Sequence, residues 1–244
     1  MDPSVILDNL PRFLSGAWVT LQLTAISMLI GLVLAVPIAL ARLSPNPLLS
    51  WPAYGFMFYF RGTPLLVQIF LIYYGSGQFV PELRAVGLWQ FFREPYFCAI
   101  LTLTLNTAAY TAEILRGAIR AVPFGEVEAG RAFAMSRTLM LRRVILPKAF
   151  RLALPAYTNE VIFLFQATSL VSIITIMDLT GVGRVIIAET FRTFEVWIFV
   201  GLCYLVMSYA ILYGFKRVEH RLSAHLREGP AVAAAPAEEA LAIR

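Results

Sequence analysis

Charged residues are scarce in this sequence. Charged residues occupy 14% of its 244 positions and hydrophobic residues occupy 59%, more than a soluble domain of this length needs for its core. Apolar runs of about 18 residues or more recur, and each could cross roughly 30 Å of hydrocarbon as a helix. Barrel strands are about ten residues of alternating polarity, so these evenly apolar runs predict an all-α membrane protein. The predicted spans are residues 16–41, 51–74, 96–115, 152–177 and 196–215.

Cysteine and histidine are scarce as well, with two of each in the whole sequence. Cys98 and Cys203 fall inside the third and fifth predicted spans, where a thiol usually packs as a small hydrophobic group. His220 and His225 stand in a charged tail, where exposure to solvent is more common than metal binding. We therefore expect neither a disulfide nor a metal site.

Motifs for catalysis and for nucleotide binding are missing too. The sequence has no Gly-rich Lys-Ser/Thr loop that could hold phosphates. Glu113 and Glu160, the acidic residues inside the predicted spans, lie on different helices with no nucleophile or base beside them, which argues against an enzyme. Five unequal spans do not divide into inverted repeats, which argues against a stand-alone channel or secondary carrier without excluding it. We expect no cofactor in this chain and no nucleic acid partner.

The distribution of basic residues predicts an orientation. The connection between the third and fourth spans carries eight Lys and Arg residues between positions 116 and 151, far more than the connections on the opposite side. The positive-inside rule places this connection in the cytoplasm, so the amino terminus is predicted outside and the carboxyl terminus inside. Residues 1–225 then form a transmembrane domain in contact with lipid. The segment 226–244, rich in Ala, Pro and Glu, is predicted to be disordered.

The basic connection contains a segment with helical character, residues 122–147. It reads as a short helix through Met135, a possible N-cap at Ser136, and a second helical piece that ends near Pro147. Apolar residues at i, i+3 and i+4 give the first helix a small apolar face. Such a helix can lie on a membrane, support its own fold, or bind in a groove of a partner, and periodicity does not choose among these.

The same segment resembles the EAA loop, the signature of permease subunits in bacterial ABC importers. The resemblance rests on EAG at 128–130, on Ala134 and on VILP at 144–147. It implies that a coupling helix inserts into a cleft of a separate ATPase through Glu128, Ala129, Gly130, Arg131, Ala132, Phe133 and Ala134. Gly130, Ala134 and Val144 depart from the family pattern, which has Ala, Gly and Ile there. Ala134 leaves open whether the chain turns as a glycine would allow.

Three further segments resemble the polar amino acid permeases: RGTPLLVQ at 61–68, LNTAAYTAE at 105–113 and LPAYTNEVI at 154–162. The last is most similar to the M-type permease subunit of the histidine, lysine, arginine and ornithine importer and its opine-uptake relatives. The resemblance implies a type I ABC importer permease fold in a bacterial inner membrane. It also implies a second homologous permease, two copies of an ATP-binding subunit that binds ATP and Mg, and a periplasmic or lipid-anchored solute-binding protein.

Glu160, beside Asn159 in the fourth span, calls for a function, because an acidic side chain in mid-membrane costs about 2.5 to 3.5 kcal/mol on insertion scales. From the residues alone, a structural pairing and a contact with substrate are equally open. The resemblance implies that an acidic residue at this position meets the cationic end of the ligand. The predicted cargo is thus histidine, arginine, lysine, ornithine or an opine. The alternative is a neutral or acidic amino acid, with Glu160 structural.

The other predicted substrate contacts come from the second and third spans. Pro64 should kink or open its helix, because proline has no N–H and clashes with the preceding turn, and this would expose Thr63 and Gln68. The alternative is that Gln68 bonds another helix. Asn106 and Tyr110 lie on one face of the third span. The predicted substrate site is therefore Glu160, Gln68, Asn106, Asn159, Thr63 and Tyr110.

Overall fold

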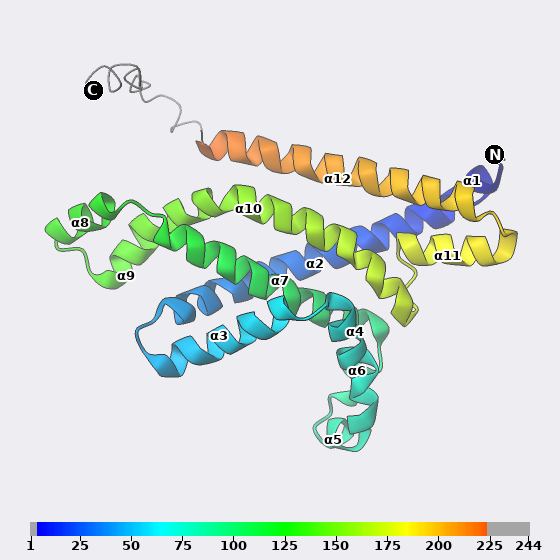
Figure 1. The fold of residues 1–244 in the computed structure, drawn as a ribbon, viewed down its shortest axis with the longest axis horizontal. Coiled ribbons are helices and arrows are strands. Elements are labelled where there is room, and N and C mark those ends of the chain that lie inside the picture. The colour runs from blue at the N-terminus through cyan, green and yellow to red at the C-terminus, as the bar shows by residue number, and fades with distance from the viewer. Residues whose placement is uncertain (1–3, 224–244) are drawn as a thin grey trace, which may run out of the picture.

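The computed structural model describes residues 4–223, and all of their regular elements are helices. The segment 226–244, predicted to be disordered, lies outside the described residues. The chain forms an elongated bundle with α8 and α9 at one end and α1 and α11 at the other, as Figure 1 shows. We call these the α8 end and the α11 end. The prediction of an all-α fold is confirmed.

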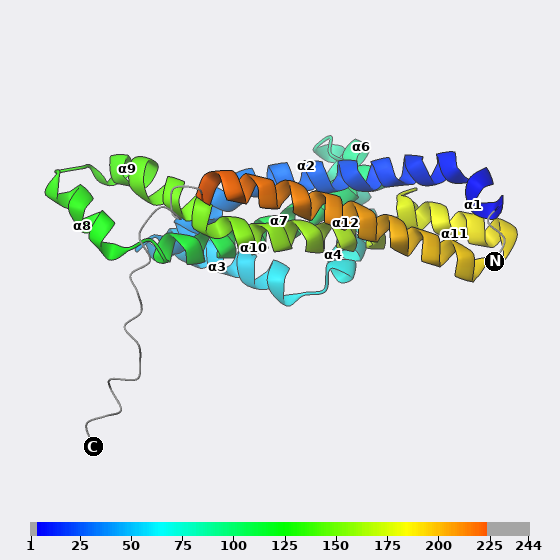
Figure 2. The same cartoon turned by 90° about the horizontal axis from the view of Figure 1, so that it is seen from above.

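Four helices within the described residues are long and apolar enough to cross a membrane. They are α2 (Leu10–Leu43), α7 (Pro95–Arg120), α10 (Leu146–Ala167), whose candidate span extends over residues 137–174, and α12 (Thr193–Ser223). One apolar cluster joins α2 to α7 and α10 around Leu23, Leu103 and Val161, and another joins their α8 ends around Ala39, Leu115 and Ala149. Figure 2 shows α12 running along the outside of this bundle.

The second predicted span is broken rather than straight. Helix α3 (Pro47–Gly62) is followed by helix α4 (Leu65–Tyr73), with the break at Thr63 and Pro64, and the bend between Pro47–Gly62 and the helical segment Leu65–Ala85 is 106°. The pair counts as a fifth span only if both helices are taken together. The chain continues through η1 (Gly75–Phe79), α5 (Val80–Ala85) and α6 (Trp89–Phe92), which project from one side of the bundle in Figure 1. The sequence predicted the kink at Pro64 but not its size.

The connection between the fourth and fifth spans folds into α11 (Leu179–Thr190), which the sequence reading did not predict. It follows η3 (Thr168–Ile174) and begins at Asp178, whose side chain accepts hydrogen bonds from the N–H groups of Thr180 and Gly181. The N–H of Leu179 donates to Thr20 Oγ1 of α2 at 3.1 Å. These bonds satisfy the first turn of α11 and fix the helix against the bundle.

The α8 end contains α8 (Phe124–Ala132) and α9 (Arg137–Met140), and Ser136 is the N-cap of α9 as predicted, because its side chain accepts from Leu139 N–H. The prediction that the second helical piece ends near Pro147 is wrong. The chain passes from α9 through a π-helical stretch, η2 (Leu141–Ile145), directly into α10. Because proline has no N–H and clashes with the carbonyl four residues back, the helix accommodates Pro147 by widening for one turn.

Ala134, which follows α8, has a φ of +52°. This is the left-handed region, which costs an L-residue with a Cβ roughly 1–2 kcal/mol and a glycine nothing comparable. The chain therefore turns at this position as a glycine would, although it carries alanine. The sequence left open whether the chain turns at Ala134, where the family pattern has glycine. The structure shows that it does turn there, with a strained backbone.

Replacing Ala134 with glycine should relieve this strain and stabilise the turn by about 1 kcal/mol. Amide hydrogen exchange over residues 124–140 should slow by about fivefold, measured by mass spectrometry. The matched control is Ala132→Gly at the last residue of α8. A glycine there should speed exchange, because it loosens a helix by up to about 1 kcal/mol. Faster exchange in both variants would contradict the strained turn.

Candidate functional site

The break between α3 and α4 is held together by side-chain amides. Pro64 cannot donate to the carbonyl of Phe60, and that oxygen instead accepts from Gln68 Nε2 at 2.9 Å and from Asn106 Nδ2 at 3.3 Å. Gln68 Nε2 also lies 3.1 Å from the carbonyl oxygen of Thr63 and 2.8 Å from its Oγ1. These amides thus satisfy the carbonyls of Phe60 and Thr63 at the bend.

The side chain of Gln68 serves to hold this break together. Its side chain is 1% exposed, and its Oε1 accepts from Asn106 Nδ2 at 3.0 Å. Of the six residues predicted to contact substrate, it is the one that the structure does not place on the wall of the cavity described next. The arrangement corresponds to the alternative in which Gln68 bonds another helix.

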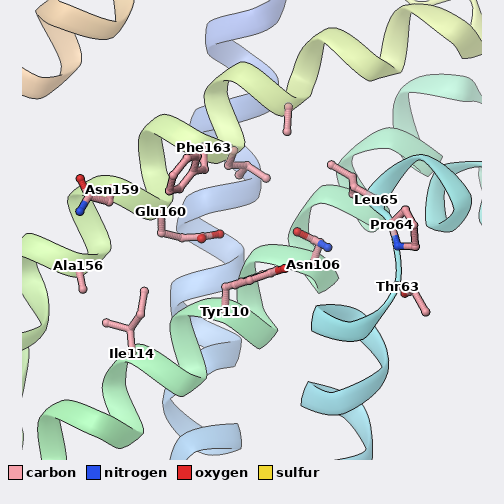
Figure 3. A pocket seen from close by; sticks show the side chains of 12 residues that line it. Thr63, Pro64, Leu65, Asn106, Tyr110, Ile114, Ala156, Asn159, Glu160 and Phe163 are labelled. Atoms are coloured by element: carbon pink, nitrogen blue, oxygen red, sulfur yellow. The ribbon is translucent and has the colours of Figure 1, made fainter.

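A cavity of about 490 Å³ lies between the α3–α4 break, α7 and α10. The other five predicted contacts, from three separate segments, all line it: Thr63, Asn106, Tyr110, Asn159 and Glu160. Apolar side chains complete the wall, among them Leu65, Ile114 and Phe163. Figure 3 shows Glu160 and Asn106 directed toward each other from α10 and α7. A mostly apolar cavity with a few converging polar groups is the usual form of a small-molecule site.

Glu160 is the one charged residue among the described residues that line the cavity. It is 8% exposed, and its Oε1 accepts a hydrogen bond from Thr107 Oγ1 at 2.9 Å. No Lys, Arg or His nitrogen of residues 4–223 forms an ion pair with Glu160, and the ion pairs of these residues involve other acidic side chains. A buried carboxylate without a cation is costly, and a bound cation would lower that cost.

Asn106 complements Glu160 across the cavity. The amide of Asn106 donates two hydrogen bonds through Nδ2, to the carbonyl of Phe60 and to Gln68 Oε1, which leaves Oδ1 as an acceptor. In Figure 3 this oxygen lies on the side that faces Glu160. Tyr110 donates its hydroxyl to the carbonyl of Arg61 at 3.4 Å. Asn159 is exposed and points away from the pair along another side of α10.

Thr107 is a site residue that the sequence reading missed. It is fully buried and orients Glu160, and it packs where α2 comes close, since a Cβ on Gly31 would lie 2.4 Å from Thr107 Cγ2. The helical face that singled out Asn106 and Tyr110 excludes the next residue, about 100° further round. The glycine in the first span was the available signal, because glycine in membrane helices permits close approach.

The segment predicted to bind an ATPase forms a projecting turn of the structure. Phe124 and Phe133 are 65% and 84% exposed at its two ends, and Glu128, Ala129 and Ala132 are exposed between them. Gly130 instead faces inward, where an added Cβ would lie 3.2 Å from Met140 Cε. An ion pair between Glu126 and Lys148 connects α8 to α10. The apolar face of α8 therefore has no partner among residues 4–223.

Comparison with protein families agrees with this geometry. Residues 27–224 match the family described as Binding-protein-dependent transport system inner membrane component. The chain is 50% identical to the nopaline transport system permease protein NocM of Agrobacterium fabrum, over 93% of this chain and 94% of that protein. It is 43% identical to the histidine/lysine/arginine/ornithine transport system permease protein HisM of Escherichia coli, over 87% of this chain and 90% of that protein.

Comparison with solved structures gives the same fold. A crystal structure of an amino acid ABC transporter with histidines contains a chain that superposes with a TM-score of 0.81 at 33% identity, covering 91% of this chain and 99% of that one. An inward-facing MetNI methionine ABC transporter matches with a TM-score of 0.74 over 88% of this chain and 98% of that one. At 22% identity, the second likeness concerns the fold alone.

Replacing Gln68 with leucine should destabilise the chain by about 2 kcal/mol, because two carbonyls and one amide would lose buried partners. Thermal unfolding in detergent, followed by tryptophan fluorescence, measures the effect. Gln78→Leu is the matched control, since Gln78 is exposed in η1 and surface changes are usually within about 0.5 kcal/mol. Equal melting temperatures for the two variants would show that the break does not depend on the amide.

Proposed function

We propose the following mechanism on one premise: this chain belongs to the family of binding-protein-dependent transport system inner membrane components, as a permease subunit of an amino acid or opine ABC importer. Such a subunit spans the membrane and is not an enzyme. Hydrolysis of ATP belongs to a partner ATPase, and a solute-binding protein delivers the substrate. The proposal concerns the cargo of this chain, its contact with the ATPase and its orientation.

The cargo that fits the cavity is a cationic amino acid or an opine with a cationic end. The observation that carries this proposal is Glu160, a nearly buried carboxylate on the cavity wall that has no cation within the described chain. An ammonium or guanidinium group only donates hydrogen bonds. Glu160 and Asn106 Oδ1 both accept, so one cationic head can bridge them. Relatives named for nopaline, octopine and histidine/lysine/arginine/ornithine transport support this assignment.

Thr107 makes this binding site a rigid one. Its hydroxyl holds one oxygen of Glu160 at 2.9 Å, and Gln68 holds the amide of Asn106 at 3.0 Å. The two acceptors are therefore fixed before the ligand arrives, which lowers the entropy lost on binding. Partial exclusion of water by the apolar wall strengthens a charge pair compared with the same pair at the surface.

The α8 turn is the proposed contact with the ATPase. Support comes from the exposed apolar face between Phe124 and Phe133, which is typical of a helix that binds in a groove. With this turn in the cytoplasm, the amino terminus lies outside. The proposed membrane is the bacterial inner membrane. A second homologous permease completes the pathway, two ATPase copies bind ATP and Mg, and the binding protein docks at the α11 end.

Replacing Glu160 with glutamine should lower stimulation of the reconstituted complex by cationic amino acids about tenfold or more, because a charged hydrogen bond contributes about 1.5 to 3 kcal/mol. The measurement is ATPase activity across a panel of cationic and neutral amino acids, each delivered on the binding protein. Glu82→Gln, an exposed acid in α5, is the matched control. Equal stimulation of the unaltered complex by neutral and cationic amino acids would refute the cationic cargo.

Replacing Glu128 with alanine should reduce substrate-stimulated hydrolysis by at least about tenfold, because contacts at the centre of an interface are often worth 2 kcal/mol or more. The subunit should remain inserted and keep its melting temperature, since Glu128 is exposed and forms no ion pair within the described residues. Glu82→Ala controls for the loss of one surface charge. Undiminished stimulation in the Glu128 variant would contradict the coupling role.

A further inference from the structure

A second cavity, separate from the proposed substrate site, lies near the α8 end between α2, α3 and α7. Its volume is about 530 Å³, and four arginines line it: Arg42, Arg61, Arg116 and Arg120. They come from three helices, and Arg42 and Arg120 stand in the last turns of α2 and α7. The gathering of guanidinium groups from separate elements in one hollow is a property of the fold, because no local run of the sequence contains them all.

The positive charge of this cavity is not balanced by the residues that the structure describes. Glu113 is the one acid on the wall, and it pairs with Arg116 and, at 3.6 Å, with Arg61. Arg42 donates to Ser50 Oγ at 3.0 Å and stacks over the ring of Tyr54 at 4.9 Å. Arg120 forms no ion pair within residues 4–223. Two guanidinium groups therefore remain available to an anion.

The surface beside the cavity is apolar and aromatic. Trp51, Tyr54 and Phe58 lie on one face of α3, are 70%, 43% and 68% exposed, and contact one another in sequence with ring centroids 6.4 and 5.8 Å apart. Tyr54 and Phe58 also line the arginine cavity. Aromatic side chains that border a polar site at the end of a span are typical of the membrane interface.

We propose that the cavity formed by Arg42, Arg61, Arg116 and Arg120 binds the phosphate of an anionic phospholipid, whose acyl chain lies along the aromatic face of α3. A free phosphate ion shares the headgroup chemistry but would not use this face. The exposed aromatic face of α3, which lies beside the arginines, therefore favours a lipid over a free phosphate ion as the occupant. Basic pockets between membrane helices are established places for anionic headgroups.

The test uses the full chain in detergent, titrated with brominated phosphatidylglycerol or with brominated phosphatidylcholine of the same acyl chains. Bromine quenches nearby tryptophan, so the quenching lost in Trp51→Phe reports lipid at the face of α3. The unaltered chain should bind phosphatidylglycerol at least about tenfold more tightly than phosphatidylcholine. Arg120→Gln should weaken phosphatidylglycerol binding about fivefold and Arg42→Gln/Arg120→Gln about 25-fold, with phosphatidylcholine unaffected.

The control is Arg84→Gln, which removes an exposed arginine of α5 that does not line the cavity and should leave the preference unchanged. Equal affinity for the two lipids, or an equal loss in the Arg84 and Arg120 variants, would overturn the proposal. Competition by millimolar inorganic phosphate would also overturn it, by showing a site for a soluble anion. An unchanged melting temperature in detergent shows that a variant is folded, and Arg120→Gln alone decides if the double variant is not.

Discussion

The hydrogen-bonded break at Pro64 is the constraint on which the rest of the site depends. A carbonyl exposed within a membrane protein must find a donor, and Phe60 finds two, from Gln68 and Asn106. Because these amides come from α4 and α7, they fix both the 106° bend and the position of α7 beside it. The cavity wall at Thr63, Pro64 and Leu65 exists because the chain turns there. A continuous second helix would place different side chains on this wall.

The opposite wall of the cavity depends on a different kind of contact, the close approach of two helices at a glycine. Gly31 lets α2 approach α7 so closely that any Cβ would collide with Thr107. Thr107 in turn gives its hydroxyl to Glu160 of α10. Three helices thus meet where a carboxylate is to be held inside a largely apolar bundle. Glu160 is positioned by packing and one hydrogen bond, and it forms no ion pair within residues 4–223.

Some of this arrangement could be predicted from the sequence, and the division has a physical cause. Pro64 predicts a kink and Ser136 a helix cap, because both act on their own turn of backbone. The face of Asn106 and Tyr110 follows from helical periodicity. The direction of the Gln68 side chain does not follow from periodicity, because it depends on the bend between α3 and α4, which contacts with α7 hold in place. Asp178 could have predicted the start of α11, because aspartate is a common N-cap. The hydrogen bond that holds α11 against α2 could not be predicted, because it joins Leu179 to Thr20, 159 positions away in the sequence.

The path from α8 to Glu160 is continuous along the chain. Ser136 starts a helix that runs through α9, the π-helical η2 and α10 without a gap, and Glu160 lies on this helix. The pair Glu126–Lys148 ties α8 to the same helix a second time. A displacement of α8 would therefore reach Glu160 through a stiff element. The widened turn at Leu141–Ile145 lies on this path, between α8 and Glu160. Asn106 lies on α7, which ends at Arg120 shortly before α8 begins at Phe124, so α8 is joined along the chain to both helices that carry the facing pair Glu160 and Asn106.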